Sequence, residues 1–195
     1  MSKKKLVMLV TSLIVIGTML IGGTLAYFTD QDTAENVITL GKVDGELEEP
    51  KWDEANPDGE IKNIVPGDKI VKDPILTVAQ DSQKAYVRFK VAYEGLTAEQ
   101  FAELKFLKTN GTEEEEATFD ADGYFYVQKI MEPGEIYQLF DYVVIPKTWK
   151  NDMALKTFKI NITAELVQAD NFEPVKTGDV ITGWGEVEVE QYTAE

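Results

Sequence analysis

The residues that could carry chemistry in this chain are its carboxylates. The sequence contains 35 Asp and Glu residues against 19 Lys and Arg residues, and it contains neither histidine nor cysteine. This composition excludes a Ser-His-Asp triad, a cysteine nucleophile and a zinc site built on histidine. Carboxylates alone could act as a pair in glycoside hydrolysis, or could hold a divalent cation.

The acidic stretches do not have the spacing that these two activities need. Glu113 to Glu116 form a straight run, which is typical of a solvated loop, whereas a calcium site spaces its acids around a turn. Asp120-Ala-Asp-Gly123 resembles half of a calcium loop, but no acid follows at the required distance, so we interpret it as a turn. Asp141, between Phe140 and Tyr142, is expected on the solvent face or paired to a lysine. We therefore predict no catalytic residue, no metal ligand and no cofactor, and we expect that the protein is not an enzyme.

The N-terminus has the layout of a secretory signal peptide. Three lysines precede a run of ~20 apolar or small residues, and the small residue Ala26 follows it. We predict a signal peptide over residues 1–26 with cleavage between Ala26 and Tyr27. The run is also long enough to span a bilayer, so an uncleaved anchor is the alternative. The net charge of −16 argues against nucleic acid as a partner.

Residues 27–195 are expected to form one domain. Residues 85–94 and 156–168 alternate between apolar and polar side chains, as half-buried antiparallel strands do, and this places Arg88 and Glu165 on the solvent face. Residues 97–107 are predicted to be the one short helix, because Thr97 and Gln100 can form a capping box. Loops are expected over 48–60 and 109–118, and a short helix or loop over 177–184. The pattern favours an all-β, antiparallel, jelly-roll-like sandwich.

Several motifs, in this order, resemble the TasA/camelysin family. Gly22-Gly-Thr-Leu-Ala-Tyr-Phe-Thr-Asp30 and Asn36-Val-Ile-Thr-Leu-Gly41 look like the N-terminal region of proteins cut by the signal peptidase SipW. Six further motifs resemble the core of the family: Val65-Pro-Gly-Asp68, Lys72-Asp-Pro74, Ala85-Tyr-Val-Arg-Phe-Lys-Val91, Asp122-Gly-Tyr-Phe-Tyr126, Pro133-Gly-Glu135 and Ala164-Glu-Leu-Val-Gln-Ala-Asp170.

This resemblance implies a jelly-roll domain that a Gram-positive cell secretes and that assembles into biofilm-matrix fibres, in the extracellular matrix or at the cell surface. The chain would be membrane-associated before the signal is cleaved. Its partners would be further copies of itself, a SipW-type signal peptidase during export, and accessory matrix proteins. Assembly would proceed by strand addition, in which residues 27–40 of one subunit pair with the next subunit. The anchors of this donor strand would be Tyr27, Phe28, Val37, Ile38 and Leu40.

Three alternatives stay open. Residues 27–40 could be an ordinary first strand folded into their own domain. The protein could be a camelysin-like cell-surface metallopeptidase, since some members of the family are classed as such, although this sequence lacks histidine and a zinc-binding motif. It could also be a monomeric surface adhesin.

Overall fold

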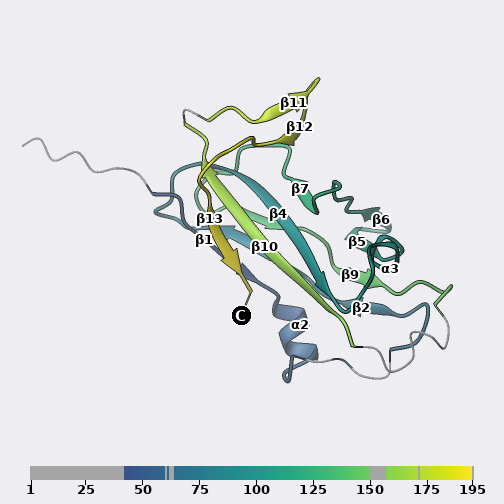
Figure 1. Ribbon diagram of the computed structural model, residues 1–195. Helices are drawn as coiled ribbons and strands as arrows, with labels where there is room; N and C mark the ends of the chain where they lie inside the picture. Colours follow the sequence, from purple (N-terminus) through teal and green to yellow (C-terminus); the bar gives the residue numbers. More distant parts are fainter. Residues whose placement is uncertain (1–41, 60, 62–63, 150–156, 171, 195) are drawn as a thin grey trace, which may run out of the picture. The chain divides into compact units, whose positions relative to one another are not determined.

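The computed structural model describes residues 42–59, 61, 64–149, 157–170 and 172–194. The predicted signal peptide and donor strand therefore lie outside the described residues. The described part is built mostly of antiparallel strands with two short helices (Figure 1), which confirms the predicted all-β sandwich. The helices are α2 (Pro50–Ala55) and α3 (Ala98–Ala102). The strands are β1 (Gly45–Glu48), β2 (Lys69–Val71), β3 (Ile75–Val78), β4 (Ala85–Glu94), β5 (Lys105–Asn110), β6 (Glu113–Glu116), β7 (Tyr124–Tyr126), β8 (Ile136–Gln138), β9 (Tyr142–Val144), β10 (Lys159–Gln168), β11 (Val175–Thr177), β12 (Val180–Gly183) and β13 (Glu190–Thr193).

One layer of the sandwich, the long-strand sheet, has the order β13-β10-β4-β7. The two central strands, β4 and β10, are each ten residues long and pair along their whole length, from Ala85 opposite Gln168 to Glu94 opposite Lys159. They run side by side across the molecule (Figure 1). The apolar residues of β4 alternate as predicted, and those of its inner face are buried.

The other layer, the bent sheet, combines the orders β1-β3-β8 and β2-β9-β5-β6. The chain passes directly from β2 into β3 and from β8 into β9, so these two continuous segments connect the two groups of strands. Two backbone hydrogen bonds continue the ladder across the bend: Lys72 N–H donates to Asp141 O at 3.1 Å, and Leu139 N–H donates to Pro74 O at 3.0 Å. Pro74 lies at this bend, where its lack of an N–H for the strand ladder does not leave a partner unpaired within β2 or β3.

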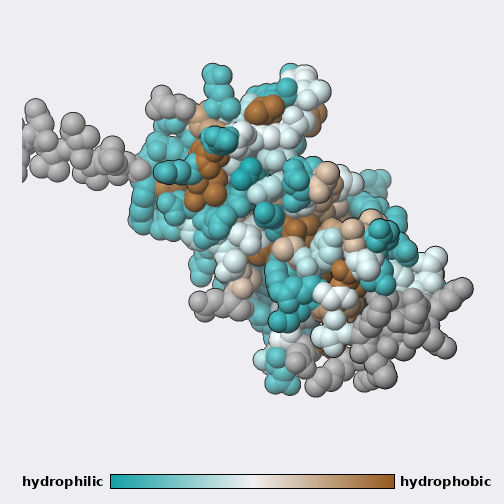
Figure 2. Space-filling model, in the orientation of Figure 1, coloured by the Kyte–Doolittle hydropathy of each residue, from teal (hydrophilic) through white to brown (hydrophobic). Residues whose placement is uncertain are grey.

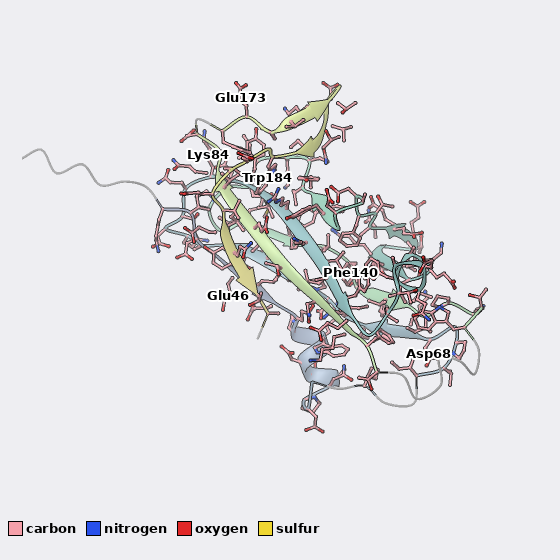
Figure 3. All side chains as sticks on the ribbon, in the orientation of Figure 1. Glu46, Asp68, Lys84, Phe140, Glu173 and Trp184 are labelled. Carbon is pink, nitrogen blue, oxygen red and sulfur yellow. The ribbon has the colours of Figure 1, made fainter. Side chains whose placement is uncertain are left out.

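The main hydrophobic core lies between the two layers. Phe89 from the long-strand sheet packs on Tyr137 from the bent sheet with ring centroids 5.8 Å apart. Phe140, which is labelled in Figure 3, is fully buried and packs on Phe106 at 5.1 Å. Because the sequence has no cysteine, the two layers are held together by this packing and not by disulfides.

The predicted helix over 97–107 begins where it was expected but ends early. Thr97 and Gln100 form the capping box, and the helix runs only to Ala102. The prediction for the remaining residues was wrong, because Lys105–Asn110 form β5. Leu104 and Phe106 are both buried, a period of two that fits a strand paired with β9.

Three other local predictions were also wrong. Residues 48–60 were expected to be a loop, but they contain α2, which starts with a proline at its first turn. Residues 109–118 contain the edge strand β6 in place of a plain loop, although all four glutamates are exposed as expected. Residues 177–184 contribute to the hairpin of β11 and β12, not to a helix.

Candidate functional site

A buried charged cluster lies at the bend of the sheet, around the Lys72-Asp73-Pro74 motif. Asp73 is completely buried, and its Oδ1 accepts hydrogen bonds from the backbone N–H groups of Lys51 at 3.1 Å and Trp52 at 3.0 Å. These two N–H groups lie in the first turn of α2, where a helix has no partners of its own. Asp73 therefore fastens α2 to the bend.

Lys72 and Glu49 form a buried ion pair beside Asp73. The distance from Lys72 Nζ to Glu49 Oε2 is 2.7 Å, and both side chains are almost fully buried. Lys72 Nζ also lies 5.1 Å from the centre of the Trp52 ring. Burial raises the pKa of Glu49, while the charge of Lys72 and its hydrogen bond act in the opposite direction. Glu49 Oε1 is buried without a hydrogen-bond partner, so this pair is not fully satisfied.

Asp141 closes the same bend from the β9 side. It is 8% exposed, and its carboxylate accepts hydrogen bonds from Thr109 N–H at 2.7 Å, Gln138 Nε2 at 2.7 Å and Lys51 Nζ at 3.1 Å. Burial alone would raise the pKa of Asp141, but these hydrogen bonds and the Lys51 charge outweigh it, and the pKa is lowered. The sequence suggested a lysine partner or the solvent face for this residue; the first is confirmed, and the second is wrong.

A second charged pair lies on the outer face of the long-strand sheet. Arg88 pairs with Glu165 at 2.5 Å, and the Arg88 guanidinium carbon lies 4.2 Å from the ring centre of Tyr124 and 4.5 Å from that of Trp184. Gln191 Nε2 donates to the other Glu165 oxygen at 2.8 Å. Stacking between two aromatic rings stabilises a guanidinium ion that has lost much of its water.

The predicted solvent exposure of Arg88 and Glu165 was wrong. The chain after β10 folds back over this face and forms a second hydrophobic cluster around the buried residues Val167, Ile181 and Trp184. Figure 3 shows Trp184 where the hairpin of β11 and β12 approaches the long strands. The alternation of β4 and β10 could not reveal this cover, because it comes from a segment further along the chain.

A hollow of about 550 Å³ lies between α3 and residues 116–123, and it is lined mainly by aromatic and small side chains, among them Tyr93, Phe101 and Phe106. Asp120 at its rim accepts hydrogen bonds from Asp122 N–H and Tyr124 N–H, which confirms the predicted turn. Among the residues that the structure describes, no three Asp or Glu side chains are grouped so as to hold a metal ion.

The sequence-predicted site residues lie outside the described part of the chain. These are the cleavage pair Ala26 and Tyr27, and the anchors Tyr27, Phe28, Val37, Ile38 and Leu40. Their roles stay predictions. Within the described ranges, no helix has the length and hydropathy needed to cross a membrane.

Comparison with known proteins gives one family. A family model described as camelysin metallo-endopeptidase matches residues 1–107. A search of curated proteins gave no match. Among solved structures, the sporulation control protein Spo0M from Bacillus subtilis is 14% identical over 81% of this chain, with a TM-score of 0.24. The chain spans only 50% of the Spo0M chain, and this likeness is too distant to bear on fold or function.

The buried pair at the bend yields a prediction for stability. Replacing Lys72 by Met leaves the Glu49 carboxylate buried without its partner, and we expect a loss of about 3–5 kcal/mol in the free energy of unfolding. The double variant Glu49→Leu with Lys72→Met should recover most of this loss, because neither charge is then buried. Urea unfolding of both variants measures the difference. The exposed pair of Lys159 and Glu94, 4.0 Å apart, is the control, and the same changes there should cost less than about 1 kcal/mol.

Asp141 yields a prediction for the pH dependence of stability. Since its pKa is lowered in the folded chain, its charge stabilises the fold above the ordinary pKa of an unfolded aspartate, about 3.9, and this contribution is lost as the pH falls through the folded pKa. Asp141→Asn should cost about 1–3 kcal/mol at pH 7, and the gap to the wild type should narrow below about pH 4. Urea midpoints between pH 7 and pH 3 measure it, with Asp179→Asn on the exposed hairpin as control. A gap that stays constant with pH would contradict the assignment.

Proposed function

The chain belongs to the camelysin metallo-endopeptidase family, and from this premise we propose that it is a secreted structural protein that polymerises into extracellular biofilm-matrix fibres. Subunits join by donation of the N-terminal strand, residues 27–40, from one copy to the next. The function is structural, not catalytic.

One observation carries this proposal: the candidate donor segment leads directly into an end strand of a sandwich. Lys42, the first described residue, is already bonded to the turn between β3 and β4, because its carbonyl accepts from Gln83 N–H at 2.9 Å. Ala79 N–H likewise donates to the carbonyl of Asp44 at 3.0 Å, and β1 follows as an end strand of the order β1-β3-β8. A β-branched, apolar segment attached to such a strand is suited to strand addition, in which backbone hydrogen bonds supply affinity and alternate side chains fill pockets. Repeated head to tail, this contact makes a filament.

The route to the cell exterior forms part of the same proposal. A SipW-type signal peptidase cleaves between Ala26 and Tyr27, which frees the donor segment from the membrane. The protein then acts at the cell surface or in the extracellular matrix, with itself as main partner and accessory matrix proteins as further partners. Nucleic acid is not a partner, because the chain carries a net charge of −16.

The family description favours one competing function, a cell-surface metallopeptidase. Hydrolysis by a zinc enzyme needs three protein ligands and a water, most often with histidine among the ligands. The sequence contains no histidine and no cysteine, and the described residues contain no group of three acids placed for a metal. These observations support the structural function.

Removal of residues 27–40 tests the fibre function. The full chain, exported with its own signal by a Gram-positive host, should give filaments in electron micrographs of the culture medium. A variant that lacks residues 27–40 should remain dispersed, because it has no strand to donate, while its thermal unfolding shows that the domain is folded. Dispersed monomers of the intact chain would contradict the proposal and favour an adhesin.

The peptidase alternative has its own test. We expect the purified secreted chain to leave casein intact over hours, both with added zinc and with a chelator, because no described group can hold the metal. Cleavage that a chelator stops would overturn the structural function. The Glu49→Leu, Lys72→Met double variant is a useful companion, since it shows whether the buried charges contribute to any activity seen.

A further inference from the structure

We propose that the open edge of β8 accepts the donated N-terminal strand of a second copy of this chain. The inference rests on the proposed fibre function and names the surface that receives the donor. β8 is an end strand in the order β1-β3-β8, so its outer backbone groups have no neighbouring strand among the described residues. Ile136, its first residue, is 63% exposed, the largest value among the exposed large hydrophobic residues of the described chain.

The neighbouring hairpin stops short of β8 and leaves this edge open. β5 pairs with β9 only from Lys105 opposite Val144 to Leu107 opposite Tyr142, and the hairpin does not pair with β8. The hairpin of β5 and β6 contacts β8 through a side chain: Lys108 Nζ donates a hydrogen bond to the carbonyl of Gln138 at 2.7 Å. A row of strand backbone bonded on one side only is a template for another strand.

Both faces of β8 can accept apolar side chains. On the inner face Tyr137 is partly buried, with its ring centre 5.8 Å from that of Phe89 and 6.2 Å from that of Phe125. On the outer face Ile136 is exposed. In an added strand, Ile38 and Leu40 would share one face and Val37 would lie on the other, because side chains alternate. The apolar residues of the donor thus match both faces of this edge.

The other end strands are poor acceptors for this donor. The donor itself carries three acids, at positions 30, 32 and 35. β6 consists of four exposed glutamates, β1 presents Glu46 and Glu48, and β13 starts at Glu190 in an acidic tail, so each repels the donor. β7 is covered by β12, whose Ile181 carbonyl accepts a hydrogen bond from Gln128 Nε2 and whose Ile181 N–H donates one to Gln128 Oε1. β2 lies against α2, and β11 has no buried side for a strand to cover.

The charge around β8 differs from that of these edges. Lys108 Nζ lies 4.8 Å from the ring centre of Tyr137 and, within the described residues, has no carboxylate in ion-pair distance. The charge of Glu115, which lies opposite Lys108 in the pair of β5 and β6, also acts on Tyr137, and Glu135 next to β8 is paired with Lys129. Lysine and glutamate thus face this edge together, and it does not repel an acidic strand as β6 does.

The donor must come from another copy because of its length. Leu40 is two residues before Lys42, and two residues span at most about 7 Å. A strand added outside β8 lies three strand spacings from β1, which is about 14 Å. A copy cannot therefore place its own anchors up to Leu40 on its own β8, whereas a second copy can. Because donor and acceptor are different surfaces, the contact repeats without closing.

Two variants of the full secreted chain test the acceptor. Ile136→Lys places a charge on the acceptor edge and should raise the concentration needed for filaments at least about tenfold. The matched control is Val175→Lys, which alters a 52% exposed valine on β11 and should assemble as the wild type does. Both sites are exposed, so both variants should keep the wild-type unfolding midpoint.

Cysteine pairs give a direct readout, because the natural chain has none. Ile136→Cys combined with Val37→Cys or with Ile38→Cys should give disulfide-linked ladders of subunits within the filaments, whereas Val175→Cys with the same partners should not. If the wild type makes filaments that need residues 27–40, yet Ile136→Lys assembles normally or no ladder forms at position 136, the acceptor edge is wrong and the fibre function stands. If the wild type makes no filaments, the fibre function and the acceptor fail together.

Discussion

The bend of the sheet depends on the two oxygens of Asp73. This carboxylate is completely buried, yet it is satisfied by the free N–H groups at the start of α2. Pro74 cannot donate to a strand partner, so the ladder between β2–β3 and β8–β9 turns at this point. Asp73 fills the turn with a polar contact that an apolar residue could not make. The bent sheet thus joins its two halves through a short polar segment, and α2 covers the gap that the bend opens.

Buried charges recur where one element of this fold is laid over another. Lys72 and Glu49 join the α2 region to the bend, and Arg88 and Glu165 join β4 and β10 beneath the C-terminal segment. A buried ion pair contributes little net stability, but removing one partner is costly, so such pairs favour one arrangement over its neighbours. In a chain without disulfides, the pair of Arg88 and Glu165, which lie opposite each other on β4 and β10, favours one register of the long strands and one position of the covering hairpin. Figure 2 shows that the face in view is largely hydrophilic but carries several hydrophobic patches, and a small one lies at the hairpin, where Val175 and Val180 are exposed.

The parts of the fold that a local pattern determines could be predicted from the sequence. The alternation of β4 and β10 indicated the antiparallel layers, and the capping box at Thr97 marked the start of α3. The end of α3 could not be predicted in the same way, because Leu104 fits a helical face with Phe101 and equally fits a strand with Phe106. Contacts between distant segments were also out of reach. The motif around Lys72 was visible, but its partner Glu49 and the aromatic cover of Arg88 depend on the tertiary fold.

The acidic surface limits how such a domain can associate with its own copies. With a net charge of −16, two copies repel each other, and most end strands add local repulsion because glutamates line them. Charged edges of this kind are how β proteins avoid unwanted sheet growth. An end strand without such glutamates is therefore a candidate site for the addition of another strand. At β8 the exposed large hydrophobic residue is Ile136, and Lys108 Nζ lies 4.8 Å from the ring centre of Tyr137. In the proposed fibre, the charge pattern would therefore leave the β8 edge as the direction of growth.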